Sequence, residues 1–73
     1  MSNLRFELFK ELPKTKVFTV ISTHGDVELG YIKWYTQWRE YVFEPFANTI
    51  YSYDCMAEIV EEIMRLMEER KIK

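Results

Sequence analysis

The sequence predicts an α+β fold, in which an antiparallel β-meander of four or five strands carries one C-terminal amphipathic helix on one of its faces. Two observations lead to this prediction. Residues 4–51 contain short segments that alternate apolar and polar side chains and are separated by glycine, proline or asparagine. Residues 54–71 instead repeat their apolar side chains at the spacing of a helix. At 73 residues the chain is expected to form one domain that spans residues 1–73.

The predicted strands after the N-terminal segment follow the turn signals of the chain. They span residues 16–23, 27–35, 39–44 and 49–51. The first of them is rich in β-branched side chains, and the His-Gly-Asp sequence at residues 24–26 is typical of a hairpin loop. Residues 36–38 form a tight connection, and Pro45 ends a strand because it lacks an amide donor.

The segment at residues 4–11 suits either a strand or a helix. Its apolar residues alternate between Leu4 and Leu8, as in a strand, whereas Leu4, Leu8 and Leu12 repeat at helical spacing. Because residues 13–15 are typical of a turn into the next strand, we expect an edge strand here.

The C-terminal helix is predicted to have one apolar and one acidic face. The apolar face comprises Met56, Ile59, Val60, Ile63, Leu66 and Met67. Ser52 or Asp54 can accept a hydrogen bond from a first-turn amide, and the terminal bases suit the negative end of the helix dipole. We expect Met56, Met64, Met67 and Cys55 to be core side chains rather than the lining of a partner groove.

Alternation divides the strand side chains between two faces of the sheet. The face expected to meet the helix comprises Ile32, Trp34, Tyr41, Phe43 and Ile50. The opposite, open face is expected to carry Leu29, Tyr31, Lys33 and Tyr35. Because this second set includes Lys33, we expect it to face solvent.

The open face is the predicted binding surface, because residues 30–46 hold both tryptophans, three of the five tyrosines and two of the five phenylalanines. One small core does not need so many rings. The predicted ligand-binding residues are Tyr31, Lys33, Tyr35, Trp38 and Arg39. Exposed rings flanked by cations can stack bases and reach phosphates, and two such faces can also pair in a homodimer. Cross-strand aromatic packing without a ligand is a third interpretation.

The chain is not expected to be an enzyme. It has one histidine, His24, in a predicted turn, and one cysteine, Cys55, so neither a nucleophile–base pair nor a disulfide nor a zinc-type cluster is indicated. The adjacent glutamates at residues 61–62 and 68–69 point in different directions on a helix and form no carboxylate pair. We therefore predict no catalytic residue, no metal and no cofactor.

Charge and hydropathy bound the environment of the protein. A net charge of −2 gives no long-range attraction to nucleic acid, and the cations within the aromatic block make the sheet the better nucleic-acid surface. No apolar run approaches the roughly 20 residues of a membrane-spanning helix, and the first ten residues lack the apolar core of a signal peptide. We expect a soluble, cytoplasmic protein without a membrane segment.

Several motifs resemble a family of small uncharacterised bacterial and phage proteins. They are LGYIKWY at residues 29–35, WREYVFEP at 38–45, TIY at 49–51 and DCM at 54–56. The resemblance covers most of the chain from about residue 16 onward and implies a compact domain without an established activity. The strand-then-helix order is also similar in outline to the positive-cofactor family of single-stranded DNA-binding coactivators, although this chain lacks their basic strand residues.

Two functions remain open at this point. The first is a nonenzymatic binding domain whose aromatic and basic sheet face binds single-stranded nucleic acid. The alternative is a small structural or regulatory protein-interaction domain that self-associates as a homodimer. Salt separates the two, because phosphate neutralisation makes nucleic-acid affinity fall steeply with ionic strength.

Overall fold

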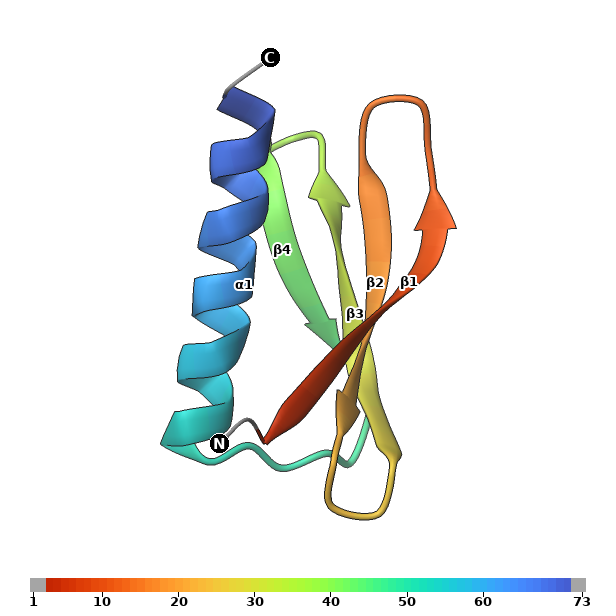
Figure 1. The fold of residues 1–73 in the computed structure, drawn as a ribbon, viewed down its shortest axis with the longest axis vertical. Helices are drawn as coiled ribbons and strands as arrows, with labels where there is room; N and C mark the ends of the chain where they lie inside the picture. The colour runs from red at the N-terminus through yellow and green to blue at the C-terminus, as the bar shows by residue number, and fades with distance from the viewer. Residues whose placement is uncertain (1–2, 72–73) are drawn as a thin grey trace.

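The computed structural model describes residues 3–71 as one four-stranded sheet and one helix (Figure 1). The elements are β1 (Leu4–Glu11), β2 (Lys16–Ser22), β3 (Val27–Tyr35), β4 (Glu40–Pro45) and α1 (Tyr53–Lys71). Neighbouring strands are antiparallel, and their order in the sheet is the order of the chain. The predicted α+β meander with a C-terminal helix is confirmed, with four strands and with β1 as an edge strand.

The core lies between α1 and one face of the sheet. Figure 1 shows α1 running alongside the sheet, nearest to β4, so that among the described residues no helix lies against the other face. The buried core residues are Leu4, Val20, Leu29, Ile32, Tyr41, Ile59 and Leu66. Trp34 and Phe43 pack against this cluster from the sheet, as alternation predicted.

The predicted face of Leu29 is wrong, because this side chain is buried in the core and does not lie on the open face. The register of β2 and β3 shifts at this point, since Val20 pairs with Gly30 but Ile21 pairs with Glu28. Leu29 is thus an additional residue in β3, a β-bulge that interrupts the period-two alternation.

The predicted strand at residues 49–51 is also wrong, because these residues form no strand and belong to the connection between β4 and α1. Asn48 has a φ of 64°, and the Thr49 hydroxyl donates to the Phe46 carbonyl at 2.9 Å, so the chain turns here. The Tyr51 hydroxyl donates to the Leu29 carbonyl at 2.8 Å and fixes the connection against β3. Ile50 consequently points outward and is 91% exposed instead of meeting the helix.

α1 begins with the predicted Ser52 cap, whose hydroxyl accepts a hydrogen bond from the Cys55 amide at 3.2 Å. Four residues of the helix contact the core in addition to the half-buried Cys55. They are Ile59, Ile63, Leu66 and Met67. The assignment of Met56, Val60 and Met64 to the core is wrong, because all three are exposed. In the part of the chain that the structure describes, no helix combines the length and the apolar character needed to cross a membrane.

Candidate functional site

A row of three rings crosses the open face of the sheet. The centroid of the Tyr31 ring on β3 lies 5.1 Å from that of Phe9 and 5.1 Å from that of Phe46. Phe9 follows Arg5 and Glu7 in the alternation of β1, which places all three on this face. Phe9 is also the additional residue of a second bulge, since Leu8 pairs with Phe18 and Lys10 pairs with Val17. The ring row, Phe9, Tyr31 and Phe46, therefore joins β1, β3 and the segment after β4.

A second aromatic contact, the corner pair, is formed by Tyr35 and Trp38 at the turn between β3 and β4. Their centroids lie 5.0 Å apart with an interplanar angle of 77°. The Trp38 amide donates to the Tyr35 carbonyl, and Arg39 has a φ of 55°, which closes the turn and brings Trp38 back to Tyr35. The Tyr35 hydroxyl donates to Gln37 Oε1 at 2.6 Å. The turn thus holds the exposed Trp38 ring against the Tyr35 ring.

An open depression of about 300 Å³ lies beside the corner pair. It is lined by Lys33, Tyr35, Trp38, Val42, Phe43, Glu44 and Pro45. Because β4 is an edge strand of the sheet, the depression is next to backbone that has a strand neighbour on one side only among the described residues. The site can therefore receive an apolar side chain from a partner.

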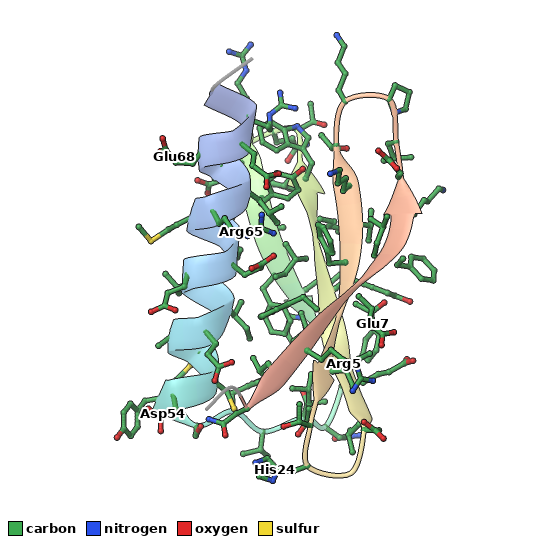
Figure 2. The ribbon with its side chains drawn as sticks, viewed as in Figure 1. Arg5, Glu7, His24, Asp54, Arg65 and Glu68 are labelled. Carbon is green, nitrogen blue, oxygen red and sulfur yellow. The ribbon has the colours of Figure 1, made fainter. Side chains whose placement is uncertain are left out.

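Two cations of the open face are held by carboxylates. Lys33 Nζ lies 3.0 Å from Glu44 Oε1. Arg5 Nε lies 2.7 Å from Glu7 Oε2, and Arg5 Nη1 lies 3.1 Å from Asp26 Oδ1. Figure 2 shows Arg5 and Glu7 together on β1, on the far side of the sheet from α1. The hydrogen bonds to Glu7 and Asp26 raise the pKa of the Arg5 guanidinium further above its ordinary value.

The predicted ligand-binding residues fall into three places. Lys33, Tyr35 and Trp38 meet around the depression. Tyr31 belongs to the ring row, and Arg39 is exposed in the turn. Their role in binding stays a prediction.

Sequence reasoning missed two members of the ring row. Phe46 is part of the aromatic block and could have been found there. Phe9 follows Arg5 and Glu7 in the alternation of residues 4–11 and could have been found by extending that alternation to the edge strand.

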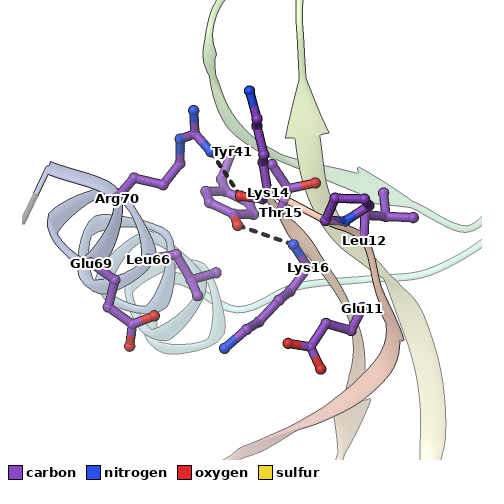
Figure 3. Close-up of a pocket in the computed structure, with 10 residues that line it drawn as sticks. Glu11, Leu12, Lys14, Thr15, Lys16, Tyr41, Leu66, Glu69 and Arg70 are labelled. Carbon is purple, nitrogen blue, oxygen red and sulfur yellow. Dashed lines mark hydrogen bonds between the residues drawn. The ribbon is translucent and has the colours of Figure 1, made fainter. Parts of the chain in front are cut away.

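A smaller cavity of about 110 Å³ lies between the β1–β2 hairpin and the end of α1 (Figure 3). Here the Lys16 amide donates to the Tyr41 hydroxyl at 3.2 Å, and Arg70 Nη1 donates to the Lys14 carbonyl at 2.8 Å. Lysine, arginine and glutamate side chains line the cavity together. The Arg70 bond joins the hairpin to α1 and the Tyr41 bond joins it to β4, so these contacts give the cavity a structural role.

No metal-ligand cluster of three or more histidine, cysteine, aspartate or glutamate residues occurs within residues 3–71. His24 is exposed in the β2–β3 turn, where its amide donates to Ser22 Oγ at 3.1 Å. Cys55 is half-buried at the start of α1. Neither the absence of catalysis nor the absence of a cofactor is tested by this arrangement, and both stay predictions.

Comparison with known proteins identified one informative relative. An uncharacterized 9.3 kDa protein of Acholeplasma phage L2 is 40% identical to this chain over 58 residues, which cover 80% of this chain and 74% of the phage protein. No protein-family model matches the chain. No solved structure matches it either.

Proposed function

The chain belongs to the same family as the uncharacterized 9.3 kDa protein of Acholeplasma phage L2, and we propose that it is a nonenzymatic interaction domain that binds through the open face of its sheet. The partner that we propose is a second copy of this chain. The observation that carries the proposal is the combination, on one face, of solvent-exposed rings with ion-paired charges.

The exposed rings supply the attraction. Phe9 is 60% exposed and Trp38 is 66% exposed, although each already contacts a second ring. Large aromatic side chains contribute most of the energy of many protein interfaces, because they bury a large area at a small cost in conformational entropy. Pairing two open faces would bury these rings and would add apolar area to a domain whose own core is small.

The ion pairs make self-pairing feasible. Two copies of a strongly charged face would repel each other, but here Lys33 is paired with Glu44, and Arg5 with Glu7 and Asp26. At Lys33 and Arg5 a two-fold arrangement therefore brings compensated pairs together rather than isolated like charges, and Arg39 beside Trp38 is the exception.

The same ion pairs count against single-stranded nucleic acid as the ligand. Phosphate binding requires cations that are available, and Lys33 would have to leave Glu44 to provide one. One observation keeps nucleic acid as the second candidate. Arg39 is exposed next to Trp38, and it makes no ion pair within residues 3–71, so it can reach a phosphate while a base stacks on the ring.

Sedimentation equilibrium over a wide range of protein concentration tests the proposal. We expect a monomer–dimer equilibrium that is nearly independent of salt, and a weaker dimer for Trp38→Ala. Tyr53→Ala, which removes an exposed ring from α1, is the matched control and should dimerise like the parent. A strict monomer at high concentration would refute self-association through this face.

The nucleic-acid candidate has its own test. A labelled single-stranded oligonucleotide is titrated at low salt and again at high salt, with the parent and with Arg39→Gln. Binding that is lost at high salt and weakened by the substitution would replace the homodimer as the proposed function. Absence of binding at low salt would remove this candidate.

A further inference from the structure

α1 carries a second apolar surface that the core does not use. Its members are Tyr53, Met56, Val60 and Met64, which are 79%, 50%, 53% and 64% exposed. Successive members are three, four and four residues apart, so they follow one side of the helix. We name this surface the outer stripe.

The outer stripe is distinct from the face of α1 that holds the helix to the sheet. Met67 shows the boundary, because its sulfur accepts a hydrogen bond from the Tyr41 amide at 3.4 Å and the side chain packs on the core. Met56 and Met64 contribute nothing comparable to the core. An apolar strip along the solvent-exposed side of a helix is a common form of interaction surface in proteins.

Carboxylates flank the outer stripe along its length. Asp54, Glu61 and Glu68 recur at intervals of seven residues, which places them in a line beside the stripe. Figure 2 shows Glu68 on the side of α1 that is turned away from the sheet. Glu62 and Glu69, next to this line on the helix, both bond to Arg65.

We propose that the outer stripe docks a basic amphipathic helix of a partner protein. From Tyr53 to Met64 the stripe is about 17 Å long, or three turns, which suits a helix of similar length laid along it. The two methionines have flexible side chains that adapt to a partner surface. Lysines or arginines beside the apolar positions of the partner would meet the line of carboxylates. This surface is separate from the open face of the sheet.

Charge also argues against a second copy of the chain on this surface. In an antiparallel pair of identical helices, equivalent flanks face each other. The line of Asp54, Glu61 and Glu68 would then lie beside the same carboxylates of the other copy, and like charges in contact oppose association. A basic helix removes this conflict, so the occupant that fits is a different chain.

The test uses a synthetic helical peptide of about 18 residues made of leucine and lysine in an amphipathic pattern. The peptide is titrated into the full chain labelled with ¹³C at the methionine methyl groups. We expect saturable shifts of the Met56 and Met64 methyl signals, while the core signal of Met67 stays in place. The same pattern built from leucine and glutamate should cause no shift.

Variants complete the test. Val60→Glu should weaken peptide binding by about tenfold or more, since it places a charge at the centre of the stripe. Glu61→Gln should weaken it at low salt. Trp38→Ala, which removes a ring from the open face, should leave peptide affinity unchanged. The test of this docking surface can therefore fail or succeed independently of the proposed homodimer.

Three results would each overturn the inference. They are no shift at the highest peptide concentration, equal binding of the acidic peptide, and shifts of the Met56 and Met64 signals on raising protein concentration alone.

Discussion

The guanidinium carbon of Arg70 lies 4.0 Å from the centroid of the Trp34 ring, so a cation–π contact holds the last turns of α1 to β3. The same guanidinium donates to the Lys14 carbonyl in the β1–β2 connection. The Trp34 ring also meets the ring of Tyr41 edge-on, at a centroid distance of 5.4 Å. Arg70 thus connects the end of α1 both to β3 and to the β1–β2 connection.

Arg70→Lys should lower the free energy of unfolding by about 1 kcal/mol, because lysine keeps the charge but loses the planar group that lies over the ring while bonding to the carbonyl. Urea denaturation measures the loss. Arg65→Lys is the control, since Arg65 bonds to Glu62 and Glu69 on the exposed surface of α1, where such pairs contribute about 0.5 kcal/mol or less. Equal losses for the two variants would contradict this role for Arg70.

Gly30→Ala should be strongly destabilising. A Cβ atom at Gly30 would lie 2.3 Å from the Glu44 carbonyl oxygen and 2.9 Å from the Pro45 Cα, and both are backbone atoms of β4 that move only with the strand. Overpacking of this kind costs about 1–3 kcal/mol or more. A thermal melt of the variant gives the loss as a lower midpoint.

Gly25→Ala is the matched glycine control. Its φ of +89° makes alanine strained, but the added Cβ would meet only ordinary contact with Val27 at 3.8 Å. We expect a loss of about 1–2 kcal/mol, smaller than at Gly30. If Gly25→Ala lowers the free energy of unfolding more than Gly30→Ala does, the close approach of β4 to Gly30 does not have the predicted effect on stability.

Tyr51→Phe should cost about 1 kcal/mol, because it removes the hydroxyl that bonds to the Leu29 carbonyl while keeping the ring. The ring still packs edge-on against Phe43 at 5.4 Å. Urea denaturation is again the measurement. An unchanged midpoint would show that the hydrogen bond does not fix the connection between β4 and α1.

Adjacent residues of β3 should respond oppositely to truncation. Trp34→Ala removes a ring that packs on the core and under Arg70, and losses of this kind are about 3–5 kcal/mol, comparable to the whole stability of a small domain. Tyr35→Ala acts on the open face and should leave the fold intact while weakening self-association. Thermal melts compare the two. Unfolding of Tyr35→Ala together with a parent-like melt of Trp34→Ala would invert the two faces.

The strands were predictable because their signals are local. Residues 4–11 and 27–35 have the predicted bounds, and β2 ends one residue earlier than expected. The predicted faces of Trp34 and Tyr35 are also confirmed, since period-two alternation follows directly from strand geometry. These features depend on neighbours in the sequence and need no tertiary information.

The errors arise where tertiary contacts override the pattern. Leu29 lies in the core and not on its predicted face because a bulge interrupts the alternation of β3. A glycine inside a strand often accompanies a bulge, so Gly30 was a signal for this one. Ile50 has strand propensity, but the hydrogen bond of Tyr51 fixes the chain in another path. Val60 is exposed because the apolar arc of α1 is wider than the contact with the sheet.

The predicted cations of the binding surface illustrate the same limit. Lys33 was expected to be available for a phosphate, but it pairs with Glu44 of the neighbouring strand. The pairing follows from the register, in which Tyr31 lies opposite Glu44 and Lys33 opposite Val42, so that the two charges are diagonal neighbours. Such a contact is not readable before the register is known.

Isotope-filtered NOE spectroscopy on a mixture of labelled and unlabelled protein tests most directly whether the open face pairs with a second copy. The signals arise only from contacts between two chains. We expect intermolecular NOEs to the ring protons of Tyr31, Tyr35 and Trp38 at a concentration where the dimer is formed. Intermolecular NOEs confined to the Met56 and Met64 methyl groups, or none from the open face in a sample that is dimeric by sedimentation, would contradict it.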